Sequence, residues 1–299
     1  MNFLLEYFYN IKISKLNFSD NYYYFIYSGY PYKLYIIDDN ININFLISID
    51  KMLLTSTLIS EIVINKNNNY VSYYNNCKYI LLKIYVNLNK KITLNEIISF
   101  DNFLYVKNIK INWGNLWSKK IDYLENLINE NGKKYPLIVD SFNYFVGMTE
   151  NAISYYNSIT VPKDYNFCLN HKYINYDDYI ETIYNPLNII FDYRARDIAE
   201  YIKNSFFNNN ISIFNELHDL LSKNYLSIID IKLIIARILY PSFYFNLYEN
   251  ILINNQNENI LVSIINGLET YEKYLSNIIN FFKQYYDVDS INWLKEKED

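Results

Sequence analysis

Hydrophobic and polar positions in the first third of the chain follow the short period of β-strands. Aromatic and β-branched runs at residues 22–30, 33–39 and 61–86 are separated by polar turn residues, a pattern typical of strands joined by hairpins. Two groups of asparagines, 67–69 and 75–76, predict turns. Residues 50–61 instead have the apolar face of one helix, with Asp50 as a candidate N-cap.

Beyond Val86 the apolar positions recur at the spacing of helices. Apolar residues lie at positions 117, 121, 124 and 128, at steps of four, three and four. They share one face of a helix, which we expect to end near Gly132. A second helix is expected to begin at Thr149, whose hydroxyl can cap it, and to stop before Pro162. Further helices are predicted around 197–204, 228–239 and 260–286.

The change of period near residue 90 predicts two lobes. The expected fold class is α+β, with a small β-rich lobe over residues 1–90 and a larger, mainly helical lobe over 91–299. The chain has 299 residues, of which 51% are hydrophobic and 20% are charged. It is therefore long and apolar enough to bury a core in both lobes.

Charge and hydropathy argue against two kinds of partner. The net charge is −5 and the lysine runs are short, so we expect no basic face for a nucleic acid. The most apolar stretch, 228–253, contains four charged residues and is broken by Pro241. A membrane-spanning helix tolerates such charges poorly. Because the N-terminus also lacks the features of a secretory signal, we expect a soluble, cytoplasmic protein without a membrane span.

Tyrosine and cysteine contents have plain explanations. The chain has 35 tyrosines, but Asn, Ile, Lys and Phe are also abundant, and the codons of all five amino acids are AT-rich. A low-GC genome therefore explains the excess. Cys77 and Cys168 lie in or beside apolar segments and are expected to be buried free thiols in a reducing compartment.

The segment 168–203 contains the residues that could carry chemistry. An apolar run leads to His171 and a polar loop, and residues 187–191 form an expected strand that ends at Asp192. Asp197 follows five residues later and is expected to open a helix. The chain has no zinc-ligand spacing, phosphate-binding glycine loop, dinucleotide fingerprint or Ser-His-Asp arrangement.

This order resembles the catalytic loop and metal-binding strand of aminoglycoside phosphotransferases and choline kinases. Their pattern is H-x-D-x-x-x-x-N, followed by an aspartate after an apolar strand. The resemblance matches His171 to the motif histidine, but Tyr173 stands at the position of the catalytic aspartate. It places Asp178 at the position of the metal-binding asparagine. It also implies that Asp192 corresponds to the aspartate that holds magnesium, and Asp197 to a structural aspartate.

The missing aspartate weighs against catalysis, so we expect no catalytic residue in this loop. A phosphotransferase needs a carboxylate to orient the attacking hydroxyl and accept its proton, and losing a general base costs about 10²–10⁴ in rate. Tyrosine is a poor substitute because its reference pKa is about 10. Asp177 is an alternative base, but its place in the loop is displaced by roughly one Cα step.

The first lobe has few nucleotide-binding features. Gly29 is the only glycine before Gly114, whereas related kinases cover the phosphates with a tight or glycine-bearing turn. Lys33, Lys78 and Lys83 are all candidates for the strand lysine that pairs with the phosphates, and their sequence context does not distinguish them.

The remaining charged residues of the segment are expected to have structural or vestigial roles. Arg194 and Arg196 lie just before Asp197, and local pairing among these three residues would fix the start of the helix. Asp178 and Asp192 are the candidate metal ligands, vestigial if the protein does not turn over nucleotide.

Further segments narrow the resemblance to one branch of the superfamily. Residues 111–128, 140–156, 191–203 and 231–251 are similar to spore-coat-associated proteins of the CotS/YutH type from endospore-forming Bacillota, nearest to YutH. The resemblance implies a bilobal, protein-kinase-like fold. It also implies a role in the endospore coat after synthesis in the mother-cell cytoplasm.

Three functional hypotheses follow. The first is a pseudokinase that acts by binding other spore coat proteins and needs no cofactor. The alternative is a small-molecule phosphotransferase that uses Mg-ATP, motivated by Asp178 and Asp192. The third is a cytoplasmic kinase-like protein in a host that does not sporulate.

Overall fold

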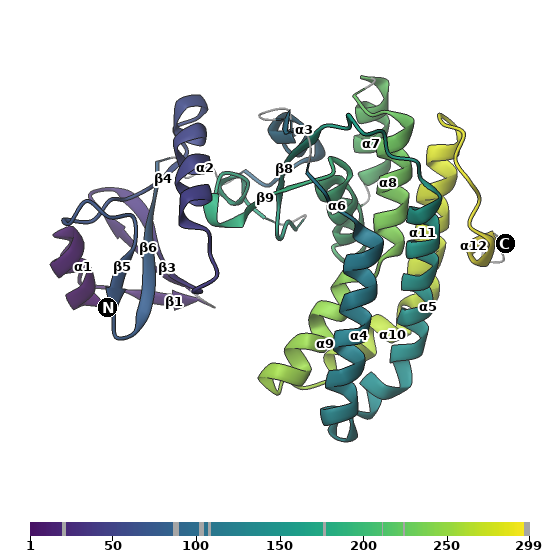
Figure 1. The fold of residues 1–299 in the computed structure, drawn as a ribbon, viewed down its shortest axis with the longest axis horizontal. Coiled ribbons are helices and arrows are strands. Elements are labelled where there is room, and N and C mark those ends of the chain that lie inside the picture. Colours follow the sequence, from purple (N-terminus) through teal and green to yellow (C-terminus); the bar gives the residue numbers. More distant parts are fainter. Residues whose placement is uncertain are drawn as a thin grey trace. The chain divides into compact units, whose positions relative to one another are not determined.

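Two compact units make up the chain in the computed structural model, which describes residues 1–19, 22–85, 90–101, 105–106, 109–175, 178–210, 212–223 and 225–295. Unit 1 comprises Met1–Ile92, His171–Tyr173 and Asp177–Ile189, and unit 2 comprises Thr93–Asn170, Ile174–Tyr176 and Ile190–Asp299. The ribbon in Figure 1 shows a sheet-rich first unit and a mainly helical second unit, as the α+β fold class predicts.

Within the described residues, unit 1 is built on an antiparallel sheet of six strands. The strand order is β1-β2-β3-β6-β4, and β5 also pairs with β6. The elements are α1 (Asn2–Tyr9), β1 (Asn17–Ser19), β2 (Tyr22–Tyr27), β3 (Tyr30–Ile37), α2 (Ile43–Ser56), β4 (Ser60–Ile62), β5 (Ser72–Tyr74) and β6 (Cys77–Ile84).

Two tight turns set the register of this sheet. Ser28 and Gly29 have φ angles of 50° and 82° and connect β2 to β3. Asn75 and Asn76 have φ angles of 47° and 60° and connect β5 to β6. Positive φ at both central residues is the conformation whose twist suits a two-residue hairpin, and Gly and Asn adopt it most readily. The predicted turn at 75–76 is therefore confirmed.

The helix expected over residues 50–61 is displaced in the structure. Helix α2 begins at Ile43, and the side chain of Asn42 accepts a hydrogen bond from the backbone N–H of Phe45 (3.1 Å). Asp50 is therefore not an N-cap but lies within α2, and residues 60–62 form β4. The expected helix therefore overlaps α2 only over residues 50–56, and the true cap, Asn42, lies about two turns before Asp50.

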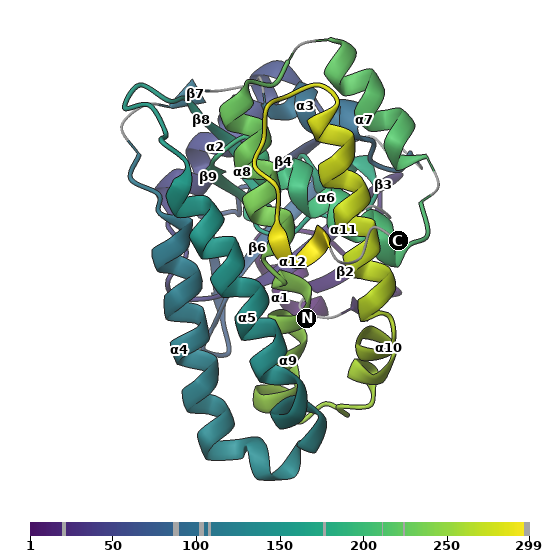
Figure 2. The same cartoon turned by 90° about the vertical axis from the view of Figure 1, so that its right-hand side faces the viewer.

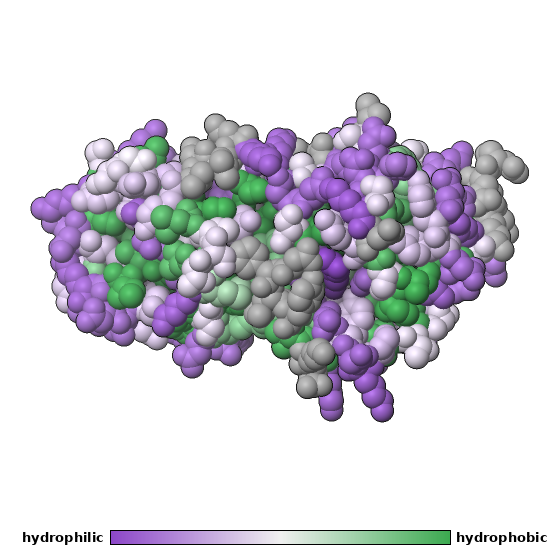
Figure 3. Space-filling view, turned by 90° about the horizontal axis from the view of Figure 1, so that it is seen from above, coloured by the Kyte–Doolittle hydropathy of each residue, from purple (hydrophilic) through white to green (hydrophobic). Residues whose placement is uncertain are grey.

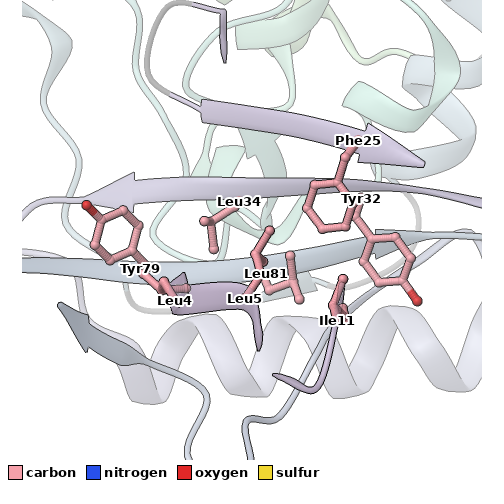
Figure 4. Close-up of a cluster of buried hydrophobic side chains, with 8 residues drawn as sticks. All are labelled: Leu4, Leu5, Ile11, Phe25, Tyr32, Leu34, Tyr79 and Leu81. Atoms are coloured by element: carbon pink, nitrogen blue, oxygen red, sulfur yellow. The ribbon is translucent and has the colours of Figure 1, made fainter. Parts of the chain in front are cut away.

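Two apolar clusters cover the opposite faces of the sheet. On one face, α1 packs against β2, β3 and β6 (Figure 4), and the cluster contains Leu4, Leu5, Ile11, Phe25, Tyr32, Leu34, Tyr79 and Leu81. On the other face, α2 contributes Leu46 to a cluster with Ile37, Ile62, Ile80 and Leu82. Because side chains alternate along a strand, β3 and β6 contribute to both clusters.

Unit 2 is mainly helical and holds a small sheet of order β7-β8-β9. Figure 2 shows α4 and α5 side by side as a long antiparallel pair. The elements are α3 (Leu94–Asp101), β7 (Tyr105–Val106), α4 (Trp113–Asn131), α5 (Pro136–Ser158), β8 (Phe167–His171), β9 (Ile189–Asp192), α6 (Ala195–Phe207), α7 (Ile213–Ser222), α8 (Ile228–Leu239), α9 (Ser242–Asn254), α10 (Ile260–Asn266), α11 (Leu268–Lys283) and α12 (Asn292–Lys295).

Two of the expected helices differ from the structure at their ends. Helix α4 reaches Asn131, as predicted from its apolar face. Thr149 does not cap a helix, because α5 already begins at Pro136 and the Thr149 hydroxyl donates to the carbonyl of Phe145 (2.8 Å). Residues 260–286 form two helices, α10 and α11, rather than one. A proline at the first helical position, with its φ already suited to a helix, was the missed start signal for α5.

The surface is mixed in character. Figure 3 shows hydrophilic residues over much of one face, with apolar residues gathered in patches. Within the described residues, no helix combines the length and the hydropathy that a membrane crossing requires.

Candidate functional site

The last residue of β8 and the loop after it hold two of the predicted site residues, both within unit 1. His171 is buried, and its Nε2 lies 2.9 Å from the carbonyl oxygen of Ile183. Tyr173 is exposed, with 69% of its surface accessible. Its backbone is held at both ends by Asn188, whose Oδ1 accepts from the Tyr173 N–H (3.1 Å) and whose Nδ2 donates to the Tyr173 carbonyl (2.7 Å). The phenol therefore stands on a well-anchored backbone.

The backbone around Asp178 is also anchored within unit 1. The Asp178 carbonyl accepts a hydrogen bond from the N–H of Ile92 (2.9 Å), and Tyr179 forms a β-bridge with Lys91. The carboxylate of Asp178 is half-buried. Asp177, the alternative base considered from the sequence, lies outside the described residues.

The three candidate lysines have different surroundings on the sheet. Lys33 lies on the face of β3 that α2 covers in part, opposite Tyr24 of β2. Lys83 projects from the other face of the sheet and stands between the rings of Tyr30 and Tyr85, 4.3 and 4.2 Å from their centroids. Lys78 forms an ion pair with the exposed Asp39. Lys33 is therefore the one of the three that has the surroundings of a ligand-binding lysine.

Lys33 lines a pocket of about 840 Å³ within unit 1. The lining includes Lys12, Lys15, Tyr22, Tyr24 and Glu181. The Lys33 ammonium lies 5.2 Å from the centroid of the Tyr22 ring. Burial lowers the pKa of Lys33, and the carboxylates of Glu181 and Asp178 oppose this shift. The pocket thus combines cations with aromatic walls, a combination suited to an anionic, ring-containing ligand.

Helix α2 offers no free carboxylate to this lysine. Its one acidic residue is Asp50, which is buried and accepts a hydrogen bond from the Ile62 N–H through Oδ1 (2.9 Å). Burial raises the pKa of Asp50 to about 6. Asp50 therefore ties α2 to β4, whereas an active kinase of this general fold uses a helix carboxylate to orient its strand lysine.

Asp192, the predicted magnesium ligand, is buried within unit 2 and already has protein partners. Its Oδ1 accepts from the indole N–H of Trp113 (3.0 Å) and from the backbone N–H of Tyr193 (2.8 Å). Its Oδ2 accepts from Nη1 of Arg196 (2.8 Å). A carboxylate has about four lone-pair positions, so three are occupied, and Arg196 balances the charge. A metal ion would have to compete with this guanidinium.

The buried charges continue along α6 to α8. Arg237 Nη2 and Lys203 Nζ lie 2.8 and 3.0 Å from Oε1 of Glu200. Burial alone would raise the pKa of Glu200, but the nearby cations, first Lys203 and then Arg237, lower it to about 2. Burial lowers the pKa of Lys203 to about 8, against the opposing effect of Glu200. Arg237 also lies 4.9 Å from the Trp113 ring centroid. Trp113 therefore contacts both Arg237 and Asp192 and connects the two sets of buried charges.

The start of α6 is fixed by a further set of polar contacts. Asp197 donates its backbone N–H to Oδ1 of Asn170 (3.3 Å), and Asn170 Nδ2 donates to the Asp192 carbonyl (3.3 Å). Arg194 donates to the Tyr225 carbonyl (2.8 Å), and its Nε lies 3.8 Å from Oδ2 of the buried Asp101. Burial, reinforced by Asp197, raises the pKa of Asp101 well above its usual value.

Sequence reasoning missed four members of the unit 2 network. These members are Trp113, Glu200, Lys203 and Arg237. They are far apart in sequence or lie on helical faces that look amphipathic. The available signal was Arg237, a cation flanked by apolar residues on both sides in the strongly apolar segment 228–239. A charge buried among apolar side chains must find a partner.

Comparisons with known proteins agree with this architecture. The model of the family described as "Spore coat putative kinase YutH" matches residues 3–282. The endospore coat-associated protein YutH of Bacillus subtilis (strain 168) is 26% identical over 207 residues. That alignment covers 61% of this chain and 61% of the relative, so it leaves more than a third of each unmatched.

Solved structures show the same fold at low sequence identity. Spectinomycin phosphotransferase in complex with ADP and spectinomycin has a TM-score of 0.60 at 13% identity, covering 99% of this chain and 97% of that one. An aminoglycoside phosphotransferase from Alicyclobacillus acidocaldarius has a TM-score of 0.57 at 12% identity, covering 91% and 92%. With its protein-kinase-like fold and a family match over nearly its whole length, the chain belongs to the YutH family of spore coat proteins.

Proposed function

We propose that this protein is a pseudokinase of the spore coat, which acts by binding other coat proteins rather than by transferring phosphate. The observation that carries the proposal is the exposed phenol of Tyr173 at the position matched to the catalytic aspartate. A phenol with a reference pKa of about 10 is mostly protonated near neutral pH and is poorly suited to accept a proton from an attacking hydroxyl. We also propose that the protein is synthesised in the mother cell.

Two further features support a binding role. The carboxylate of Asp192 is balanced by Arg196, so magnesium would have to displace a buried ion pair. The acidic residue of α2, Asp50, is engaged by the backbone of β4 and leaves Lys33 without the helix partner of an active kinase. In each unit, therefore, an acidic residue considered for phosphoryl transfer is already engaged by other groups of the protein.

Lys33 favours a second candidate, a Mg-ATP-dependent small-molecule phosphotransferase. It projects into the large pocket of unit 1, near the carboxylates of Glu181 and Asp178. An ammonium whose pKa is lowered by burial gains when an anion binds beside it. This candidate requires both nucleotide binding and turnover.

A titration with ATP, with and without Mg²⁺, separates the two candidates. A nucleotide at about 100 times its Kd would stabilise the fold by roughly 2.7 kcal/mol, measured as a shift of the thermal midpoint. We expect no ATP-dependent phosphorylation of an acceptor. The phosphotransferase candidate requires saturable binding of ATP. Lys33→Met should abolish that binding, whereas Lys83→Met, on the other face of the sheet, should leave it unchanged. Turnover lost on Asp192→Ala would overturn the pseudokinase proposal.

The coat role is tested in a sporulating cell. A fluorescent fusion expressed from the native promoter should collect at the forespore surface during coat assembly. A fusion that remains diffuse through sporulation, at normal abundance and length, would contradict the proposal. Partner proteins captured by cross-linking at that stage should include coat proteins.

A further inference from the structure

Unit 2 contains an apolar pocket whose described lining includes none of the kinase-motif residues. The pocket has a volume of about 220 Å³ and lies where the end of α6 meets the start of α9, α10 and the start of α11. Figure 2 shows the chain passing from α9 through α10 into α11 at this end of the unit. Its main lining residues are Phe206, Phe207, Phe243, Ile264, Leu268 and Tyr271.

Aromatic rings form much of the lining of this pocket and contact one another both face to face and edge on. The rings of Phe207 and Tyr271 are nearly parallel, with centroids 5.7 Å apart and an interplanar angle of 24°. Phe243 meets Tyr271 edge-on at 5.3 Å and 77°. Phe206 meets Tyr271 at 5.1 Å and 62°. A guest ring among such walls can make offset-stacked and edge-to-face contacts, the arrangements that aromatic pairs prefer.

The polar groups of the lining are already satisfied. The hydroxyl of Ser263 donates to the carbonyl of Ile260 (3.1 Å), and the hydroxyl of Tyr271 donates to the carbonyl of Ile238 (3.4 Å). Among the residues described as lining the pocket, none carries a charge. A water molecule needs two to four polar partners, so an apolar pocket of this kind holds water poorly. A charged ligand would lose hydration without compensation.

We propose that this pocket binds a neutral ligand bearing a single aromatic ring. An apolar cavity of roughly 150 Å³ lined by Leu, Ile and Phe is large enough for benzene, so 220 Å³ accommodates a substituted ring. Phe207, one of the lining residues, is 38% exposed. The proposal does not rest on the kinase-like site, since unit 2 alone supplies the lining residues described.

The test uses fluorobenzene as a probe, observed by fluorine NMR on the full chain. We expect saturable broadening and shift of the probe signal, reversed by competition with toluene. The charged analogue 4-fluorobenzoate should bind at least tenfold more weakly, because the lining that the structure describes offers no compensating cation. Probe signals that do not saturate, or equal affinity for the two probes, would overturn the proposal.

Variants then locate the binding. Ile264→Trp adds volume inside the pocket and should weaken fluorobenzene binding at least tenfold. Val262→Trp is the matched control, since Val262 is on the same helix, is 40% exposed and is not among the pocket residues. Leu268→Phe fills the pocket from α11 if the first variant does not fold. Unchanged binding in a folded pocket-filling variant would place the probe elsewhere and refute the assignment. If neither variant folds, the comparison of the two probes on the unaltered chain decides.

Discussion

Asp192 illustrates how one neighbouring residue changes the meaning of a matched motif position. By sequence it corresponds to a magnesium-binding aspartate, yet its carboxylate accepts from Trp113, Tyr193 and Arg196 inside unit 2. Breaking a buried ion pair leaves the remaining charge uncompensated, which costs more than the pair contributes as a whole. At the scale of single residues, the carboxylate is therefore needed to hold α6 against α4 whether or not a metal ever binds.

Arg196→Met is expected to destabilise unit 2 by about 3–5 kcal/mol, because it leaves the Asp192 charge buried without its cation. The three tryptophans, at 113, 117 and 293, all lie in unit 2, so denaturation followed by tryptophan fluorescence reports on this unit. The double variant Asp192→Asn/Arg196→Met should recover part of the loss. If Mg²⁺ restored the stability of Arg196→Met, Asp192 would be a metal ligand after all.

Helix α2 depends on two contacts at its polar positions. Asn42 caps its first turn, and Asp50 connects its middle to β4 through the Ile62 N–H. A helix cap satisfies backbone donors that would otherwise lack partners. At the scale of elements, these contacts decide where α2 begins and how it lies on the sheet beside Lys33.

Asn42→Ala should destabilise α2 by about 1 kcal/mol through loss of the cap. Since unit 1 contains no tryptophan, amide hydrogen exchange over residues 43–48 is the appropriate measurement. Asn44→Ala, at an exposed position in the same turn, is the matched control and should change exchange by much less. Equal effects of the two substitutions would show that the cap contributes nothing.

The molecule as a whole contains buried carboxylates that respond to pH in opposite directions. Glu200 in unit 2 has a pKa lowered to about 2 by its cations, after burial is overcome. Asp50 in unit 1 has a pKa raised to about 6 by burial. A lowered pKa contributes stability above the unfolded-state value, and a raised pKa contributes stability below it. The two units should therefore respond differently to acid.

Glu200→Gln should destabilise unit 2 by about 3–5 kcal/mol at pH 7, since Lys203 and Arg237 lose their buried counter-charge. The contribution of Glu200 is present above the unfolded-state pKa of 4.5 and is lost as the pH falls towards 2. The difference in the free energy of unfolding between the original chain and the variant, measured by tryptophan fluorescence, should become smaller over that pH range. A difference in the free energy of unfolding that did not change with pH would mean that the charge of Glu200 is not what stabilises the unit.

Asp50→Asn tests the opposite sign in unit 1. The amide oxygen can still accept from the Ile62 N–H, but it carries no charge. The contribution of Asp50 is full below the unfolded-state pKa of 3.8 and is lost as the pH rises through about 6. The variant should therefore gain protection of the Ile62 amide relative to the original chain above pH 6 and not below pH 4. A gain of the same size at both pH values would contradict the assignment.

Sequence alone determined the features that are encoded in short windows of this protein. The hairpin at Asn75 and Asn76, the face and end of α4 and the motif around His171 and Tyr173 all depend on neighbours a few residues away, where periodicity and turn chemistry operate. The tertiary structure decided which lysine lines the pocket, which cation balances Asp192 and where Arg237 finds its carboxylate. Lys33 and Arg237 meet their carboxylates from distant parts of the chain, and Arg196 meets Asp192 through the turn from β9 into α6. These pairings depend on packing, and a buried charge acquires its role only from the partner that replaces water.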